Sequence, residues 1–396
     1  MKITKVRLFQ LEGVMEFPGD FWEERLVRPI DIYPERKAEG ASRTTPKTAD
    51  GKYRIESGFV EVETDEGVSG LGGPIGGDQA QVIARQLAPL IVGEDPRATE
   101  RLWDILYRAQ VHGRGGTAMM ALSALDCALW DLKGKWAGAP IYRLLGGPTR
   151  TEIPAYASAL GYSIEPERVR ERAKQIVSQG YKATKWFFRH GHLDGPEGIR
   201  KNLELARTLR DAVGDDVDVM LDAWMSWSVP YTIMMAERLV EYRPRWIEEP
   251  LMADKERDGC ALIRRRSPVQ IATGEHQYTR WGLKGLMDSG SADILQPDIY
   301  WAGGISEVSK ICAIASTYDL PVIPHGHSVP ATVQVIASQP ANTCPIQEYL
   351  IKWNEIHQFF FKEPVKPVNG VIRLTEKPGV GVEIDESKIV ERKDLA

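Results

Sequence analysis

Six acidic or imidazole side chains follow short apolar runs at nearly regular intervals in the second half of the chain. They are Asp222, Glu248, Glu275, Asp298, His325 and Glu348. Successive members stand 26, 27, 23, 27 and 23 residues apart. Such an interval fits one strand, one helix and two loops of a β/α barrel, whose eight units take about 250 residues. The spacing therefore predicts that all six lie at the C-terminal ends of successive strands and converge on one pocket.

The first three members of this series predict a metal site. Asp222, Glu248 and Glu275 would crowd negative charge on neighbouring strands unless a hard cation held them together, and oxygen-only ligands suit Mg²⁺. We therefore expect magnesium, with open positions for substrate oxygens. Glu249 should point away from the metal if Glu248 points toward it, because neighbours on a strand face opposite sides. A helix N-cap could explain one such acid, but six in register are hard to explain by capping.

The remaining three members predict a general base and a substrate contact. Asp298 and His325 would follow adjacent strands, so the carboxylate could orient the imidazole and raise its basicity. Glu348 could then hydrogen-bond a substrate carboxylate from the far side. A proton beside a carboxylate is weakly acidic, and the enediolate formed by its removal needs a nearby cation. The set therefore predicts proton abstraction next to a carboxylate.

The elements that must position these residues show in the apolar pattern. From about Ile153 onward, short apolar runs alternate with amphipathic helices, which is typical of βα units around a parallel sheet. One such unit has a strand at 182–188, a helix with its apolar face between Ile199 and Val213, and a strand at 217–221.

The first third of the chain has a different pattern. Residues 2–11 alternate as a strand and 58–68 form a strand and turn, while leucines at spacings of three and four predict a helix across 122–132. Between the strands, residues 19–51 are polar and contain prolines. A segment that long without an obvious element is usually functional or disordered.

Size and composition limit the classes of protein. The 396 residues exceed the usual size of one hydrophobic core, so we expect two domains. A net charge of -5 without a Lys/Arg-rich run argues against a nucleic-acid partner. The chain starts without a signal-like apolar segment and has no apolar run long enough for a bilayer, so we expect a cytoplasmic protein without membrane contact. Four widely spaced cysteines predict buried free thiols rather than disulfides or a zinc site: Cys127, Cys260, Cys312 and Cys344.

The motifs around the six residues resemble the mandelate racemase subgroup of the enolase superfamily, and within it the L-rhamnonate dehydratases. The resemblance covers nearly the whole chain. It rests on the segments Met220–Ser226, Trp246–Glu249, Gly274–His276, Gln296–Asp298, Trp301–Gly304 and Pro324–Gly326, with Glu363–Val365, Pro367–Gly370, Lys377–Gly379 and Gly381–Glu383 behind them.

The resemblance implies roles for these residues. Asp222, Glu248 and Glu275 would bind Mg²⁺, and the dyad of Asp298 and His325 would abstract the proton. In dehydratases of this type the same histidine is thought to protonate the departing 3-hydroxyl, and the product tautomerises to a 2-keto-3-deoxy acid. The implied activity is that of a hydro-lyase acting on L-rhamnonate or a related aldonate in sugar-acid catabolism.

The resemblance also implies the architecture. The expected fold is α/β, a modified (β/α)8 barrel with an α+β capping domain. We assign residues 1–137, completed by 364–396, to the capping domain and residues 138–363 to the barrel. Residues 19–51 become a candidate specificity loop over the barrel mouth, and a homo-oligomer is expected because relatives commonly form one.

Two positions depart from the wider family. Many relatives carry Lys-x-Lys after the second barrel strand, where the second lysine is an opposed base. In this chain Lys185 is followed by Trp186 and Phe187, so the second lysine is missing, as it also is in the rhamnonate-type enzymes. Its absence disfavours racemisation by two opposed bases. Where the rhamnonate enzymes have a histidine beside a tryptophan, this chain has Phe21 and Trp22, so the particular sugar stays open.

Several neighbouring residues allow more than one interpretation. Lys185 could bind the substrate carboxylate or help close the end of the barrel. His276 is expected to support an oriented ligand, whereas His327 is interpreted as a loop position without chemistry. Three aromatic residues near strand ends are expected to pack rather than line a sugar site: Trp224, Trp246 and Trp301. At least two of three residues after the second strand are expected to be solvated: Arg189, His190 and His192.

Three functions compete at this point. The first is dehydration of a sugar acid by His325. The second keeps the metal and base but ends in isomerisation, epimerisation or cycloisomerisation, with Lys185 as a second acid. The presence of Phe187 in place of a second lysine argues against this function. The third is a binding protein that kept the fold without activity, since a fold does not fix function. The intact set of six residues favours an enzyme.

Overall fold

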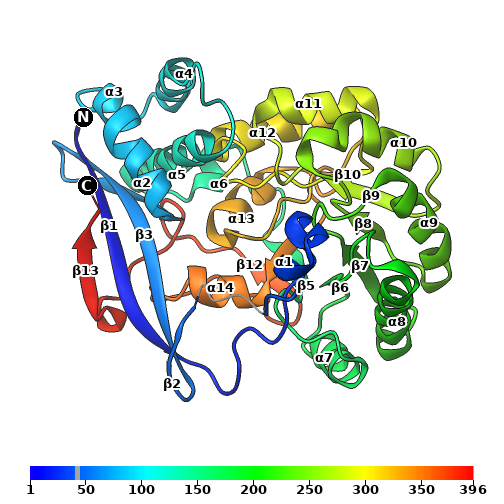
Figure 1. Cartoon of the computed structure of the whole chain (residues 1–396). Helices are drawn as coiled ribbons and strands as arrows, with labels where there is room; N and C mark the ends of the chain where they lie inside the picture. Colours follow the sequence, from blue (N-terminus) through cyan, green and yellow to red (C-terminus); the bar gives the residue numbers. More distant parts are fainter. Residues whose placement is uncertain (41–44, 396) are drawn as a thin grey trace.

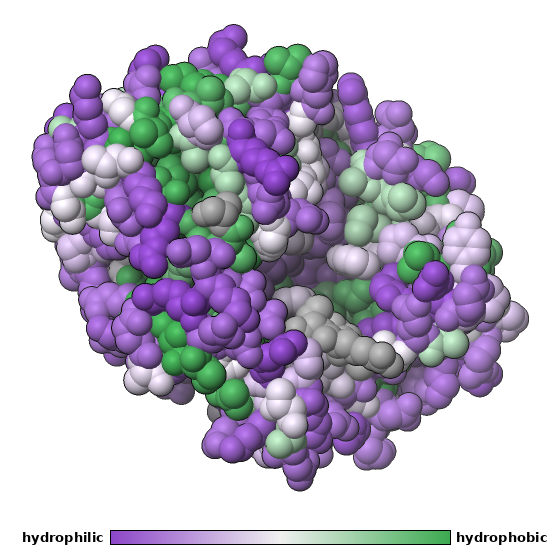
Figure 2. Space-filling view, turned by 60° about the vertical axis from the view of Figure 1, so that its left-hand side comes forward, coloured by the Kyte–Doolittle hydropathy of each residue, from purple (hydrophilic) through white to green (hydrophobic). Residues whose placement is uncertain are grey.

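The computed structural model describes residues 1–40 and 45–395. Figure 1 shows a sheet with covering helices on one side and a barrel of strands and helices on the other, with both chain ends beside the sheet. The face in Figure 2 is largely hydrophilic, with scattered hydrophobic residues and a hollow between two bulges of the surface. None of the helices in the described residues combines the length and the apolar composition needed to cross a membrane.

The capping sheet is antiparallel and uses both ends of the chain. Its strands are β1 (Ile3–Glu16), β2 (Lys47–Ala49), β3 (Lys52–Thr64), β4 (Ser69–Ile75) and β13 (Glu391–Asp394). They lie in the order β13-β1-β3-β2, with β4 also paired to β3. The tail strand β13 hydrogen-bonds to β1, so the C-terminal tail does complete this sheet. The strand expected at 2–11 continues to Glu16 because β3 pairs with it along its whole length.

Helices cover one face of this sheet. They are α2 (Gly77–Val82), the π-turn η2 (Ile83–Leu87), α3 (Ala88–Ile91), α4 (Thr99–Ala109) and α5 (Thr117–Ala137). The expected helix across 122–132 lies within α5, which is buried along most of its length. Gly70 and Gly72 of β4 have no side chain, and a Cβ at either position would meet the α5 backbone around Ala128. Glycine therefore allows the sheet and α5 to pack closely.

The barrel is a closed ring of parallel strands. Pairing runs in the order β10-β9-β8-β7-β6-β5-β11. A parallel bridge from Leu295 to Val322 and a hydrogen bond from the Val322 N–H to the Thr343 carbonyl connect the two ends of this series, so residue 322 supplies the eighth strand position. The strands are β5 (Glu152–Ser158), β6 (Ala183–Phe187), β7 (Asp218–Asp222), β8 (Trp246–Glu248), β9 (Gln270–Thr273), β10 (Ile294–Leu295) and β11 (Gln347–Leu350), with β12 (Val371–Arg373) antiparallel to β5.

Helices follow the strands and enclose the ring. They are α6 (Ile141–Leu144), α7 (Pro166–Ser178), α8 (Gly195–Val213), α9 (Val229–Leu239), α10 (Ala261–Arg264), α11 (Thr279–Ser289), α12 (Gly304–Ser316), α13 (Val329–Ser338) and α14 (Ile351–His357). Short turns lie between them: η3 (Val240–Tyr242), η4 (Ala253–Lys255) and η5 (Glu256–Cys260), and a further turn, η6 (Glu386–Lys388), precedes β13 in the tail. The expected βα unit corresponds to β6, α8 and β7, and the α/β barrel with a capping domain is confirmed.

Side chains alternate between two cores. One set fills the interior of the barrel, and the other packs between strands and helices. Trp246 is fully buried in the interior set, as expected for a packing residue. All four cysteines are buried and free, which confirms the prediction.

Residues 41–44 of the candidate specificity loop lie outside the residues that the structure describes. Its other residues, 19–40 and 45–51, are called the lid below and contain short elements that the sequence pattern did not reveal. These are the 3-10 turn η1 (Pro29–Ile32), helix α1 (Pro34–Lys37) and strand β2. In Figure 1, α1 lies in front of the barrel strands rather than on the capping sheet. The lid therefore connects the two parts of the molecule.

Candidate active site

The barrel brings the six residues of the regular series to one mouth. Asp222 and Glu248 are the last residues of β7 and β8, and Glu348 is the second residue of β11 rather than its last. Glu275, Asp298 and His325 lie two or three residues after strand positions Thr273, Leu295 and Val322. Because parallel strands end at the same edge of the barrel, all six residues meet there. None of the six is more than 8% exposed: Asp222, Glu248, Glu275, Asp298, His325 and Glu348.

Lys185 of β6 lies inside this group of carboxylates. Its Nζ is 2.7 Å from Glu348 Oε1 and 3.3 Å from Asp222 Oδ2, and it also pairs with Glu248. Burial alone would lower the pKa of Lys185, but the surrounding carboxylates outweigh burial and raise it well above its ordinary value. The lysine is therefore an ammonium that connects three strands of the barrel.

Asp298 and His325 form a hydrogen-bonded dyad. The two groups meet at 2.7 Å through His325 Nδ1 and Asp298 Oδ2, while Asp298 Oδ1 accepts the Tyr300 N–H at 2.7 Å. His325 Nε2 then faces Glu275, 3.7 Å from Oε2. Burial opposes protonation of His325, but Glu275, Asp298 and Glu348 outweigh it and raise its pKa to about 10. Asp298 thus orients the His325 imidazole through Nδ1, and Nε2 points toward Glu275.

Glu348 is fixed from two sides. Its Oε2 accepts the Gly326 N–H at 2.8 Å, and its Oε1 faces Lys185. A Cβ at Gly326 would stand 2.6 Å from the Glu348 carbonyl oxygen, so glycine is needed for this approach. Burial would raise the pKa of Glu348, but Lys185 and His325 lower it below its ordinary value.

The mouth holds more negative than positive charge. Besides the five acids of the series, Glu249 is fully buried there, and the buried partners in this group that can carry a positive charge are Lys185 and, when it is protonated, His325. Burial and the like charges of Glu248 and Glu275 raise the pKa of Asp222 well above its ordinary value. A divalent cation would offset this excess, and the oxygen-only set of Asp222, Glu248 and Glu275 fits Mg²⁺.

Glu248 and Glu249 have different hydrogen-bond partners. Glu249 lies just past the end of β8 with a φ of 40°, so strand alternation does not decide which way it points. Glu248 Oε2 accepts from Trp246 Nε1 and Gln296 Nε2, both at 2.8 Å, inside the barrel. Glu249 Oε1 lies 2.7 Å from His276 Nδ1 instead. Among the described residues, Glu249, Glu275 and His276 place one ligand atom each within 4.8 Å of one another, whereas the predicted set of Asp222, Glu248 and Glu275 does not come together this closely. The imidazole of His276 is already hydrogen-bonded to Glu249 and suits softer metals than Mg²⁺. We therefore favour the oxygen-only set of Asp222, Glu248 and Glu275 as the magnesium ligands.

A cavity of about 790 Å³ lies above the mouth. Asp222, Glu275 and His325 form part of its lining, and lid residues form another part. Two of the tryptophans for which packing was favoured over a wall beside the sugar, Trp224 and Trp301, line this cavity.

The two lid residues singled out in the sequence have different positions. Trp22 lines the cavity and donates its Nε1–H to Thr45 Oγ1 at 2.6 Å. Phe21 is fully buried and packs edge-on against Phe17. Within the described residues, Phe21 is therefore a core residue of the lid and Trp22 is the one that faces the cavity.

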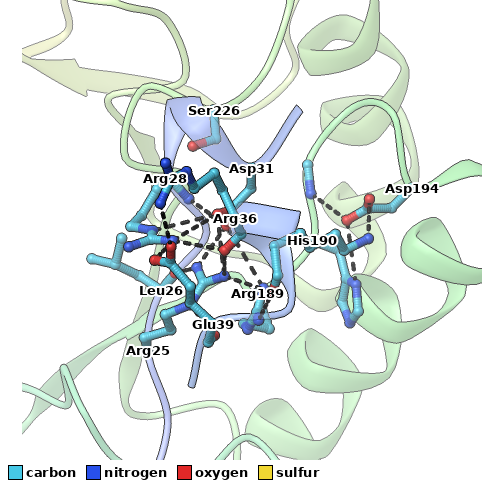
Figure 3. Close-up of polar contacts among 12 residues, drawn as sticks. Arg25, Leu26, Arg28, Asp31, Arg36, Glu39, Arg189, His190, Asp194 and Ser226 are labelled. Atoms are coloured by element: carbon cyan, nitrogen blue, oxygen red, sulfur yellow. Dashed lines mark hydrogen bonds and ion pairs between the residues drawn. The ribbon is translucent and has the colours of Figure 1, made fainter. Parts of the chain in front are cut away.

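A network of charged groups ties the lid to the barrel (Figure 3). Arg25 donates to both oxygens of Asp31 and to four backbone carbonyls of the lid. From the loop after β6, Arg189 donates to Glu24 Oε1 at 3.2 Å and to the Lys37 carbonyl at 2.9 Å. The Lys37 ammonium also pairs with Asp194 of the same barrel loop.

The residues after β6 are not solvated as expected. Arg189, His190 and His192 are each at least partly buried. His192 Nδ1 lies 3.0 Å from the Ser226 carbonyl, and the His190 carbonyl accepts from Asn202 Nδ2 at 3.0 Å. The prediction was wrong because the lid covers this loop, and the packing between two distant segments leaves no local pattern in the sequence.

Sequence reasoning also missed parts of the cavity wall. Arg28, Leu160 and Trp353 line the cavity, and so does His327, which was expected to have no chemistry. None of them stands at a strand end in the regular series. The position of His327 two residues after His325 was the one available signal.

The whole chain is similar to known proteins. Residues 168–388 match the enolase C-terminal domain-like family, and residues 47–146 match the N-terminal domain of mandelate racemase / muconate lactonizing enzyme. L-rhamnonate dehydratase of Saccharopolyspora erythraea is 35% identical over 97% of each chain. D-galactarolactone cycloisomerase of Agrobacterium fabrum is 32% identical over 99% of this chain and 98% of its own.

A solved structure agrees with this result. The crystal structure of rhamnonate dehydratase from Gibberella zeae complexed with Mg superposes with a TM-score of 0.83. It is 32% identical, and the match covers 98% of this chain and 95% of that one. The likeness therefore extends over the capping part, the barrel and the mouth.

Proposed function

The chain belongs to the mandelate racemase / muconate lactonizing family of the enolase superfamily, and on that premise we propose that it is a magnesium-dependent sugar-acid dehydratase. The substrate we propose is L-rhamnonate or a related aldonate, in keeping with the dehydratases it resembles. The observation that carries the proposal is the single oriented base: His325, held by Asp298, faces the acids of the mouth.

In this mechanism the carboxylate end of the substrate is held opposite the base. Asp222, Glu248 and Glu275 would hold Mg²⁺, which supplies Lewis-acid stabilisation of negative charge when it is bound. Lys185 is placed to orient the substrate carboxylate as a cation, and Glu348 holds the ammonium group of Lys185 in position through Oε1. These contacts prepare C2 for loss of its proton.

His325 then acts twice. Its Nε2 takes the C2 proton, and the electron pair left on the substrate forms the enediolate. The imidazolium returns that proton to the 3-hydroxyl as the C3–O bond breaks, so water leaves and an enol remains. The enol tautomerises to a 2-keto-3-deoxy acid. Asp298 keeps Nδ1 oriented and stabilises the imidazolium during both transfers.

The alternative is an isomerisation or cycloisomerisation that loses no water, and one relative of this chain is named as a cycloisomerase. It would require Lys185 to act as a second acid. Lys185 is already paired with three carboxylates, and the next inward position after it carries the ring of Phe187, 5.3 Å from the ammonium. Both observations favour the single-base dehydration.

The test is turnover of a panel of aldonic and aldaric acids with Mg²⁺, scored for 2-keto-3-deoxy products. We expect an aldonate to be dehydrated and a chelator to stop the reaction. In D₂O, deuterium entering C2 of a recovered acid without loss of water would favour the alternative. No product from any acid of the panel would contradict the proposal.

The same proposal includes the organisation of the molecule. We place the capping domain at residues 1–137 with 364–396 and the barrel at 138–363, and the pairing of the tail strand β13 with β1 supports the return of the tail to the capping domain. We also propose a cytoplasmic homo-oligomer, since the relatives it resembles are metabolic enzymes. Light scattering after size-exclusion chromatography would measure the oligomeric state, and a monomer would contradict that part.

A further inference from the structure

A second imidazole stands beside the base in the cavity wall. His327 lies two residues after His325 and lines the same cavity. The two rings are nearly parallel, with an interplanar angle of 14° and centroids 5.9 Å apart. The mechanism above gives His327 no task.

Aromatic rings hold His327 on its other sides. The ring centroids of Trp301 and Trp353 lie 5.4 Å and 5.8 Å from that of His327. Behind it, the ring of His357 meets His327 edge to face at 4.1 Å. Trp353 and His357 are four residues apart in α14 and so share one face of that helix. The His327 ring is thus packed by three neighbours besides His325.

The backbone around His327 is fixed as well. The Gly326 N–H donates to Glu348 at 2.8 Å, and the Gly326 carbonyl accepts from Asn354 Nδ2 at 2.9 Å. His357 Nδ1 lies 2.9 Å from the His327 carbonyl. Because the ring and the backbone are both held, the polar edge of His327 has a defined direction.

His327 is polar without being paired. Within the part of the chain that the structure describes, neither ring nitrogen has a hydrogen-bond partner. Burial and the neighbouring imidazoles of His357 and His325 lower the pKa of His327 well below its ordinary value. A neutral imidazole offers one N–H donor and one acceptor nitrogen. A sugar hydroxyl can accept from the first or donate to the second, whereas an apolar ligand would leave both unused.

We propose that His327 is a specificity-determining residue that hydrogen-bonds a hydroxyl group of the sugar acid beyond the reacting C2 and C3. The inference rests on the proposed dehydratase function, since His325 then fixes where C2 lies. The rest of the acid must leave the mouth along the wall that His327, Trp301 and Trp353 share. The indoles suit the C–H faces of such a chain and the imidazole suits a hydroxyl.

The test compares substrates that differ by one hydroxyl. His327→Phe keeps a ring between Trp301 and Trp353 but removes both nitrogens, and His327→Gln keeps a polar group if the Phe variant folds poorly. His112→Asn, at an exposed position, is the matched control. Steady-state kcat/KM with Mg²⁺ is measured for an accepted aldonate, such as L-rhamnonate, and for its 4-deoxy and 5-deoxy analogues.

We expect H327F to lower kcat/KM for the parent aldonate about tenfold, the value of roughly one hydrogen bond. The same variant should have no further effect on the one deoxy analogue that lacks the contacted hydroxyl, and H112N should match the wild type. Equal losses for the parent and both analogues would mean a packing role alone and would overturn the inference.

The two proposals can fail separately. Turnover of aldonates by the wild type tests the dehydratase function, whereas the pattern across analogues tests His327. If the wild type dehydrates none of the acids, calorimetric binding of the same parent and deoxy pair in the presence of Mg²⁺ replaces kcat/KM. If the dissociation constants of all these acids are then the same for the wild type and H327F, the proposed role of His327 is overturned.

Discussion

The barrel mouth and the lid are both rich in charged side chains, but they use charge in opposite ways. At the mouth, buried carboxylates outnumber the cations, and Lys185 serves three of them at once. In the lid, Arg25 is surrounded by acceptors, two from Asp31 and four from backbone carbonyls. The mouth therefore has free carboxylate charge for a cation and a substrate. Arg25, by contrast, has no free donor for a ligand, because its guanidinium nitrogens all donate to groups of the lid.

The difference shows what each region is built to do. Strands fix the mouth, so its acids are held together despite their repulsion, and a ligand can relieve that repulsion. Hydrogen bonds from Arg25 to the backbone fix the lid, so this arginine determines the shape of the lid. Changes at the mouth should consequently affect chemistry and stability, whereas changes in the tethers of the lid should affect substrate capture.

Loss of the base should have the largest effect. His325→Asn removes both proton transfers, each worth about 10² to 10⁴ in rate, so we expect kcat/KM to fall by at least about 10⁴-fold. Dehydration of the accepted aldonate is the measurement, with Mg²⁺ binding by calorimetry as the control for an intact metal site. Retention of a tenth of the activity would show that another group is the base.

Removal of the cation at the mouth should come next. Lys185→Met leaves Glu248 and Glu348 buried without their ammonium partner, and breaking a buried pair in this way costs about 3–5 kcal/mol. Urea unfolding without Mg²⁺ measures this free energy. Lys201→Met, at a half-buried helix pair with Glu204, should change it by less than about 0.5 kcal/mol. Equal stability of the two variants would contradict the charge distribution described for the mouth.

Release of the lid should have a smaller effect of a different kind. Arg189→Ala removes the contacts to Glu24 and the Lys37 carbonyl, so the lid closes less often over the cavity. We expect KM to rise about tenfold, equivalent to roughly 1.4 kcal/mol, with kcat nearly unchanged.

Arg200→Ala, an exposed residue paired with Glu197, is the matched control and should behave as the wild type in steady-state kinetics. If R189A instead lowered kcat with KM unchanged, the lid would take part in the chemical step and the contrast between the regions would not hold.

The smallest expected effect concerns the junction between lid and barrel. Lys352 Nζ donates to the Gly161 carbonyl at 2.8 Å and lies 3.4 Å from Glu23 of the lid. Burial lowers the pKa of Lys352 from 10.5 to about 8. Between these values the unfolded chain binds more protons than the folded one, so this residue makes stability rise with pH.

Lys352→Met should remove that contribution. From pH 8 to 10.5, the unfolding free energy of the wild type should increase relative to K352M, on the order of 1 kcal/mol. Chemical denaturation of both proteins across this range is the measurement. A difference that stays constant with pH would show that folding does not lower the pKa of Lys352.

The sequence alone determined the barrel and the group at its mouth. Regular spacing of six residues after apolar runs is a local signal, and parallel strands convert that spacing into proximity without further information. The expected direction of Glu249 did not follow from the sequence in the same way, because Glu249 lies just past the end of β8, where strand alternation no longer applies. The metal and base roles of these residues stay predictions until they are measured.

Only the tertiary structure decided which residues form the rest of the cavity. Trp22 faces it while Phe21 is buried, and His327 and Trp353 share a wall although they come from different loops and helices. The contacts of Arg189 with the lid were equally invisible in the sequence. Such contacts join segments far apart in the chain and depend on packing between irregular loops, for which no residue period or motif exists.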